Sequence, residues 1–115
     1  MSAAGEPLRL SVSTSGDIGS PVAEIHVVGE FDRLQVVRFD ETARTLPAAL
    51  VSVTVDLTQT TIIDSAALGS LIRLRRTLER HGCSLQVVVE RPFQITVMKV
   101  GGLDDHLNVR TPDQR

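Results

Sequence analysis

The sequence predicts one α/β domain, with a mixed, mostly parallel sheet of about four to five strands and about three to four helices. Strand-like and helix-like segments follow the order β-β-α-β-α-β-α-β, so helices join most of the strands, as in parallel sheets with right-handed crossovers. The chain is 42% hydrophobic but only 3% aromatic, so Val, Leu, Ile and Ala must fill its core, as is usual for a helix-covered sheet.

The length of 115 residues suits one compact domain. We expect residues 1–115 to form that domain, with an ordered core over about residues 7–110. The polar ends, Met1–Glu6 and Thr111–Arg115, are expected to be short and frayed.

The first two predicted strands form a hairpin. Apolar and polar residues alternate over Leu8–Val12, which is the pattern of a half-buried strand. Ser13–Pro21, rich in Ser and Gly, reads as the connecting loop, and Val22–Val28 as the second strand, which Gly29 ends. Within the second strand, alternation places Ala23, Ile25 and Val27 on one face.

A helix and a third strand are expected next. Arg33–Thr45 has helical spacing, with Asp32 as its N-cap. The residues expected to recur on successive turns of this helix are Leu34, Val37 and Phe39 or Glu41. Leu50–Leu57 alternates as a strand, Thr58–Thr61 reads as a polar turn, and Ile62-Ile63 follows as a short apolar plug.

The strongest helical pattern covers Ser65–Arg80. Its apolar residues recur at the i, i+4, i+7 and i+11 positions, namely Ala67, Leu71, Leu74 and Leu78. Arginines gather toward its C-terminal half, where the helix dipole favours cations, and Gly82 suits the position after its end.

The last third of the chain predicts a strand, a helix and one more short strand. Leu85–Val89 is an apolar strand, and Pro92 can begin the helix. The buried face of that helix is expected to include Ile95 and Met98, with Phe93 as a further candidate. Gly101-Gly102 stops it, and Leu107–Val109 suggests a last strand.

Composition argues against several classes of function. The net charge of -2 and the lack of aromatic stacking platforms argue against nucleic-acid binding. No apolar run approaches the roughly 20 residues of a membrane span, and the first six residues lack the order of a signal peptide. The single cysteine excludes an internal disulfide and fits a reducing compartment. We therefore expect a cytoplasmic domain that binds neither nucleic acid nor membrane.

No pattern in the chain indicates catalysis. The sequence has no Gly-x-Ser-x-Gly or His-Glu-x-x-His motif and no phosphate-binding glycine loop. The histidines His26, His81 and His106 are scattered, and with Cys83 they show no metal-ligand spacing. Cys83 reads as a buried small residue rather than a reactive thiol. The sequence predicts no catalytic residue, no metal, no cofactor and no enzyme.

Asp64-Ser65 is the candidate functional site. Either residue could be the N-cap of the following helix. A phosphate on a serine there would lie at the positive end of the helix dipole and add about -1.5 to -2 charge. The small residues Ala66 and Ala67 would let a partner approach closely, and the phosphate would drive that partner away. Thr60 and Thr61 are nearby hydroxyls that could compete for the phosphate, although a turn role suits them better.

Four segments resemble bacterial anti-sigma-factor antagonists of the STAS domain family. The run from Val53 to Leu71 resembles the family's signature, in which a strand, Asp-Leu and polar residues precede Asp-Ser-(Ser/Thr/Ala)-Gly-Leu-Gly. Gly29–Asp32 resembles its Gly-Glu-Leu-Asp, His81–Leu85 its Gly-Gly-x-Leu, and Val100–Leu103 the Gly-Leu that ends a helix. Together they cover roughly residues 8–109 in register.

This resemblance implies a STAS-like fold and an interaction switch. The unphosphorylated domain would bind an anti-sigma factor that is also a serine kinase, and so release a sigma factor. The kinase would then phosphorylate Ser65 and dissociate, and a serine phosphatase would reset the switch. The implied partner-binding residues are Asp32, Asp64, Ser65, Ala66, Ala67, Leu68 and Gly69.

Two departures from the family pattern support an alternative. Ala67 stands where the family usually has Gly, and Ala66 where it often has Ser or Thr. The chain could therefore be a phosphorylation-independent STAS scaffold or a small-ligand-sensing interaction module.

Overall fold

The computed structural model describes residues 8–115, so the expectation for Met1–Glu6 lies outside the described residues. Strands and helices follow each other in the predicted order. Their bounds are β1 Arg9–Ser15, β2 Val22–Phe31, α1 Val36–Arg44, β3 Ser52–Ile63, α2 Ser65–Arg80, β4 Ser84–Val88, α3 Pro92–Val100 and β5 Val109–Arg110, followed by a 3-10 helix, Pro112–Gln114. The predicted α/β class is confirmed, whereas the assignment of all of residues 1–115 to one domain stays a prediction.

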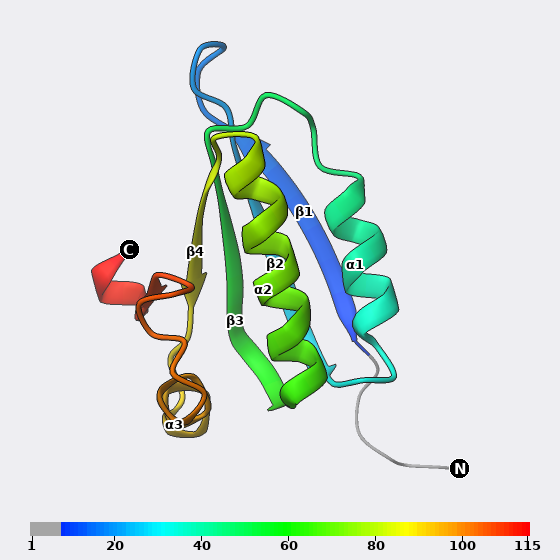
Figure 1. Cartoon of the computed structure of the whole chain (residues 1–115), viewed down its shortest axis with the longest axis vertical. Helices are drawn as coiled ribbons and strands as arrows, with labels where there is room; N and C mark the ends of the chain where they lie inside the picture. The colour runs from blue at the N-terminus through cyan, green and yellow to red at the C-terminus, as the bar shows by residue number, and fades with distance from the viewer. Residues whose placement is uncertain (1–7) are drawn as a thin grey trace.

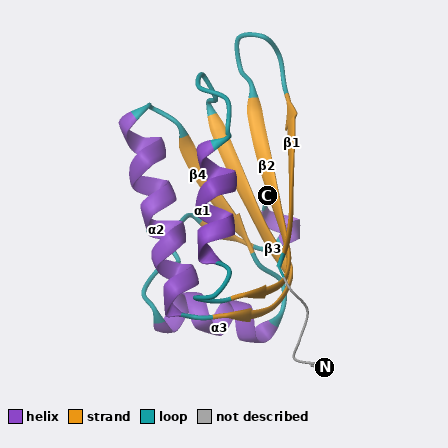
Figure 2. Ribbon diagram, turned by 90° about the vertical axis from the view of Figure 1, so that its right-hand side faces the viewer, coloured by secondary structure: helices purple, strands orange, loops and turns teal. Residues whose placement is uncertain are grey.

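Within residues 8–115, the sheet has five strands in the sequential order β1-β2-β3-β4-β5. β1 pairs antiparallel with β2, and each later pair is parallel. Because the parallel strands are added in one direction by crossovers of one hand, α1 and α2 cover the same face (Figures 1 and 2). α3 lies at the lower end of the sheet in Figure 1.

The core lies between the sheet and the helices α1 and α2. Alternate residues of β2 are buried, as the alternation predicts, and α2 buries the four predicted residues Ala67, Leu71, Leu74 and Leu78. The rings of Phe31 and Phe39 join the sheet to α1, with centroids 4.9 Å apart. Aliphatic residues supply the rest of the core, as the composition indicates.

Three strands are longer than the sequence predicts. β1 runs to Ser15, so Ser13–Ser15 belong to the strand and not to the connecting loop. Gly29 does not end β2: it has a positive φ of 103° and lies where the β2–β3 register shifts. Glycine adopts this backbone conformation without strain, so β2 continues to Phe31, while the extra residues at the register shifts lie on β3. Thr58–Thr61 is not a turn, because β3 runs through it to Ile63. The buried Thr60 hydroxyl donates to the Leu57 carbonyl at 2.7 Å, which makes Thr60 a poor competitor for modification.

The predicted start of α1 is wrong, and so is the assignment of Leu34 and Val37 to its apolar face, whereas Phe39 is buried. α1 begins at Val36 with Gln35 as its N-cap, so Asp32 does not cap it. Because the helix starts three residues later than predicted, Leu34 lies in the preceding turn at 76% exposure and Val37 points outward at 59%. Phe39 is the fully buried residue of this helix.

α3 begins at Pro92 as predicted, but Phe93 is exposed and the neighbouring Gln94 is buried. The Gln94 amide donates to the carbonyls of Leu57 and Thr60 at 2.7 and 3.1 Å. Its oxygen accepts the backbone amides of residues 90 and 91. The amide nitrogen and oxygen of this buried glutamine are both hydrogen-bonded, so Gln94 anchors α3 to the C-terminal half of β3.

The C-terminal residues also differ from the prediction. The last strand is Val109–Arg110 rather than Leu107–Val109, and Leu107 is fully buried. Thr111–Arg115, expected to be frayed, contains the 3-10 helix, and Arg115 forms an ion pair with Glu24. The C-terminus lies on the side of the sheet opposite the helices (Figure 2).

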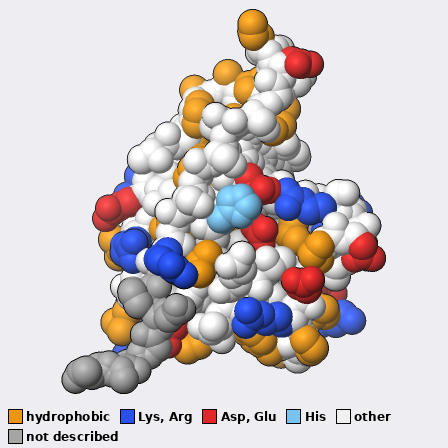
Figure 3. Space-filling view, turned by 180° about the vertical axis from the view of Figure 1, so that it is seen from behind, with side chains coloured by type: hydrophobic (Ala, Val, Ile, Leu, Met, Phe, Trp, Pro, Cys, Tyr) orange, Lys and Arg blue, Asp and Glu red, His pale blue; other side chains and the backbone are white. Residues whose placement is uncertain are grey.

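The sheet face away from the helices is mostly polar. Near its centre Figure 3 shows a histidine among acidic side chains. His26 lies 3.1 Å from Glu24 and 3.6 Å from Asp56. These contacts make His26 part of a polar cluster on this face of the sheet. Within residues 8–115, no helix is both long and apolar enough to cross a membrane.

Candidate functional site

Asp64 is the N-cap of α2, which settles the choice between Asp64 and Ser65. Its backbone is extended, at φ -104° and ψ -178°, and its Oδ1 accepts the Ala67 amide at 2.9 Å. This bond satisfies one of the amide donors that every helix start leaves without an intrahelical partner. Ser65 is therefore the first residue of the helix and not its cap.

The same carboxylate holds the β2–α1 loop. Asp64 Oδ2 accepts the Arg33 amide at 2.9 Å, and the Asp64 amide donates to the Phe31 carbonyl at 3.3 Å. Asp32 lies in this loop, where its Oδ1 accepts the Leu34 amide at 3.1 Å. The structure therefore brings Asp32, Asp64 and Ser65 together where β2 ends and α2 begins, at the lower end of Figure 1.

Ser65 is exposed at this end of the domain. Within residues 8–115, its hydroxyl makes no hydrogen bond, so modifying it would break no internal contact. The helix dipole favours a negative charge at this position, while the carboxylates of Asp64 and Asp32 oppose it. A phosphate here would thus remain at the surface and increase an existing negative charge.

The residues after Ser65 differ in exposure. Ala66 is half-buried, and so are Leu68 and Gly69. Ala67 is fully buried in the core, so the interpretation of Ala67 as a surface residue that lets a partner approach is wrong. Its helical position explains the error, because Ala67 begins the stripe that continues with Leu71.

Exposed apolar residues at the same end were missed as site residues. Leu34 and Val37 are 76% and 59% exposed, and Ile62 on β3 is 40% exposed. Ile62 pairs with Glu30 near the end of β2, so these side chains come from the ends of neighbouring elements. Both residues are apolar in the sequence, but a helix predicted to start at Arg33 places Leu34 and Val37 on its buried face. We call Leu34, Val37 and Ile62 the apolar rim.

A comparison with protein-family models matches residues 16–110 to the model described as "Mlab, STAS domain". The chain belongs to the STAS domain family. A search of curated protein sequences finds no match.

Solved STAS structures share the fold at low sequence identity. A crystal structure of an anti-sigma factor antagonist from Mycobacterium paratuberculosis has a TM-score of 0.73 and 19% identity, covering 90% of this chain and 86% of that one. Unphosphorylated SpoIIAA, an anti-sigma factor antagonist, has a TM-score of 0.70 and 16% identity, covering 88% and 87%. The phosphorylated form of SpoIIAA, a Bacillus cell fate determinant, has a TM-score of 0.63 and 16% identity, covering 88% and 90%. At these identities the likeness shows the fold.

The described residues were also compared with two other kinds of site, a metal site and a reactive thiol. No group of three or more His, Cys, Asp or Glu side chains there could hold a metal ion. Cys83 is buried, as expected, and its burial raises the pKa of the thiol, which disfavours the reactive thiolate.

Proposed function

We propose that this STAS domain is an anti-sigma-factor antagonist, and that phosphorylation of Ser65 switches it off. The observation that carries the proposal is the position of Ser65: an exposed hydroxyl at the first residue of α2, directly after its capping carboxylate. The likeness in fold to anti-sigma factor antagonists, including SpoIIAA in both phosphorylation states, supports the same role.

The site suits a partner in the unphosphorylated state. The apolar rim, at the same end of the domain as Ser65, gives a docked protein area to bury, and apolar burial favours association. Asp32 and Asp64 offer acceptors to basic groups of a partner. The proposed partner-binding set is accordingly Asp32, Asp64, Ser65, Ala66 and Leu68, with Gly69 and the apolar rim, and without Ala67.

Phosphorylation would reverse this preference. It adds about -1.5 to -2 charge at pH 7 beside two carboxylates. The basic groups of a docked partner would already pair with Asp32 and Asp64, so that partner would have to remove the added charge from water without a further cation, which costs several kcal/mol. The proposed partners are therefore an anti-sigma factor with serine kinase activity, which leaves after transfer, and a serine phosphatase. The domain would be a substrate rather than an enzyme, acting in the cytoplasm.

The test starts from a pull-down from native cells with the Ser65→Ala chain as bait, since a form that cannot be phosphorylated should retain the kinase. The captured kinase and ATP are then added to wild-type chain, and the phosphate is mapped by mass spectrometry. Ser65 lies in the single tryptic peptide Thr45–Arg73, so fragment ions must place the phosphate within it. Thr61→Ala is the matched control, because Thr61 is also an exposed hydroxyl near the site. Phosphate on Ser65 in wild type and Thr61→Ala supports the proposal, and its absence from Ser65 contradicts it.

The second candidate is a phosphorylation-independent STAS scaffold or a small-ligand-sensing module. The family model is described by another member, Mlab, and not as an antagonist. Equal partner binding by wild type and Ser65→Ala, with and without ATP, would favour it. The presence of Ala67 where the family usually has Gly does not favour this second candidate, because a buried helical position requires no glycine.

A further inference from the structure

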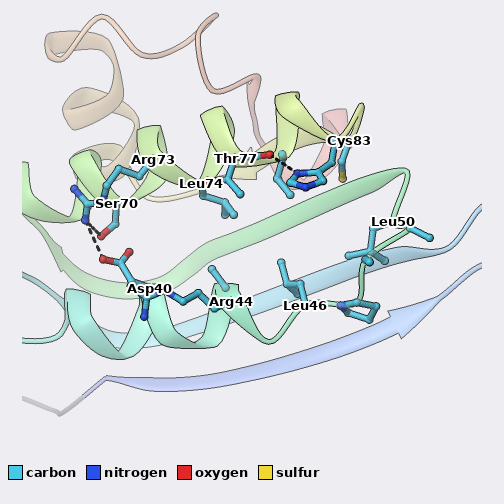
Figure 4. Close-up of a pocket in the computed structure, with 15 residues that line it drawn as sticks. Asp40, Arg44, Leu46, Leu50, Ser70, Arg73, Leu74, Thr77 and Cys83 are labelled. Atoms are coloured by element: carbon cyan, nitrogen blue, oxygen red, sulfur yellow. Dashed lines mark hydrogen bonds and ion pairs between the residues drawn. The ribbon is translucent and has the colours of Figure 1, made fainter.

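A groove on the helical face arises from the unequal lengths of α1 and α2. α1 has 9 residues and α2 has 16, so the last turns of α2 extend past the end of α1. The chain from Thr45 to Leu50 returns to β3 along this flank without forming a helix, and it contributes the small residues Ala48 and Ala49. The space left between α1, this return segment and α2 is about 610 Å³ (Figure 4).

The floor of the groove is apolar. Leu50, Leu74, Leu78 and Cys83 line it and are each between 6% and 9% exposed. Figure 4 shows Leu46, Leu50 and Leu74 between the two sides of the groove. A flat surface of a partner protein cannot enter the groove to contact side chains that are this little exposed, whereas a narrow hydrocarbon chain can. The volume is also within the range of about 300–1,000 Å³ typical of small-ligand sites.

One end of the groove carries a net positive charge. Arg73 donates to Asp40 at 3.0 Å and to the Ser70 hydroxyl at 2.9 Å, so Arg73 and Asp40 neutralise each other. Arg44, one turn further along α1, lines the same end and has no ion pair within residues 8–115. Two arginines and one aspartate leave a charge of +1 there. At the other end, His81 uses its Nδ1 to bond the Thr77 carbonyl at 2.9 Å.

We propose that this groove binds an amphiphilic carboxylate. Arg44 faces the carboxylate, and the hydrocarbon chain lies along Leu74 and Leu78 toward Cys83. Charge at one end and apolar lining along the rest match the two parts of such a ligand. The site is separate from Ser65, and the inference holds whether or not Ser65 is phosphorylated.

The test titrates the full chain with decanoate and, separately, with decanol as its uncharged counterpart. Binding is followed by calorimetry and by the rate at which iodoacetamide modifies Cys83, the chain's one cysteine. Decanoate should bind saturably and slow the modification several-fold. Arg44→Gln should weaken decanoate binding about tenfold and leave decanol binding unchanged, because only the carboxylate uses the lost charge. Arg76→Gln is the matched control, since Arg76 is an exposed arginine of α2 that does not line the groove.

A second variant tests the apolar part. Ala43→Leu adds bulk to the α1 wall of the groove and should reduce the binding of decanoate and decanol alike. Three results would overturn the proposal: no saturable decanoate binding, equal effects of Arg44→Gln and Arg76→Gln, or protection of Cys83 that rises with protein concentration in the absence of ligand. The last result would assign the groove to a second copy of the chain.

Discussion

The Asp64 carboxylate accepts the backbone amide of Arg33, which lies 31 residues earlier in the chain, at 2.9 Å. Through its other oxygen the same carboxylate caps α2 at Ala67. One side chain thus fixes both the β2–α1 loop and the start of the helix that carries Ser65. The position of Ser65 depends on this double contact.

Replacing Asp64 should therefore destabilise the domain. Asp64→Ala removes the cap and the loop contact, and we expect a loss of about 1–2 kcal/mol in the free energy of unfolding. Asp32→Ala is the control, because it removes only a local contact to Leu34 in the turn and should cost well under about 1 kcal/mol. Urea unfolding of both variants checks this, and an equal loss in the two would show that the loop contact and cap contribute little.

Gln94 should stabilise the domain more than an ordinary polar residue. Gln94→Ala removes a donor from the buried carbonyls of Leu57 and Thr60, although the Leu57 carbonyl still accepts from the Thr60 hydroxyl, and should cost about 2–3 kcal/mol. Gln86→Ala is the matched control, since half-buried Gln86 makes one bond, to the Thr54 hydroxyl at 3.2 Å, and should lose under about 1 kcal/mol. If the two variants unfold at the same urea concentration, the anchoring role of Gln94 is wrong.

The orientation of α1 can be checked by two truncations. Phe39→Ala removes a fully buried ring that packs on Phe31 and should cost about 3–5 kcal/mol. Val37→Ala removes an exposed side chain and should change stability by less than about 0.5 kcal/mol. The reverse ranking in thermal or urea unfolding would mean that α1 turns Val37, and not Phe39, toward the sheet.

Cys83 should make stability decline at high pH. Burial raises the pKa of its thiol in the folded state, so the unfolded chain loses the proton first as the pH rises. The stabilisation is complete below the pKa of the unfolded thiol, about 8.5, and is lost as the pH increases through the higher pKa of the folded state. Wild type should lose more stability than Cys83→Ala between neutral and alkaline pH. Parallel pH profiles for the two would contradict this assignment.

The elements that sequence predicted best are those that local signals determine. α2 was predicted with its observed bounds because a capping residue, a long apolar stripe and Gly82 all agree. The fold class followed from the alternation of strands and helices, which needs no exact boundaries.

The errors occurred where distant contacts override local preference. Gly29 and Thr58–Thr61 favour turns by themselves, but pairing with β3 keeps Gly29 in the sheet, and hydrogen bonds from Gln94 hold the bulged segment of β3. The apolar rim was hidden for a related reason: the Asp64–Arg33 contact holds the loop before α1, and no short-range pattern reveals that contact. The cap of α2 at Asp64 can be predicted because its chemistry is local, whereas the role of Ser65 stays a prediction.

Phosphorylation of Ser65 should release a bound anti-sigma factor, and a comparison of binding affinities checks this. The captured kinase, without ATP, is titrated with wild-type chain, chain phosphorylated on Ser65, Ser65→Ala and Ser65→Glu. We expect wild type and Ser65→Ala to bind alike, and the phosphorylated chain to bind at least about 100-fold more weakly, which corresponds to about 2.7 kcal/mol. Ser65→Glu should fall between them because it adds less charge. Equal affinity of the phosphorylated and unphosphorylated chains would contradict the account.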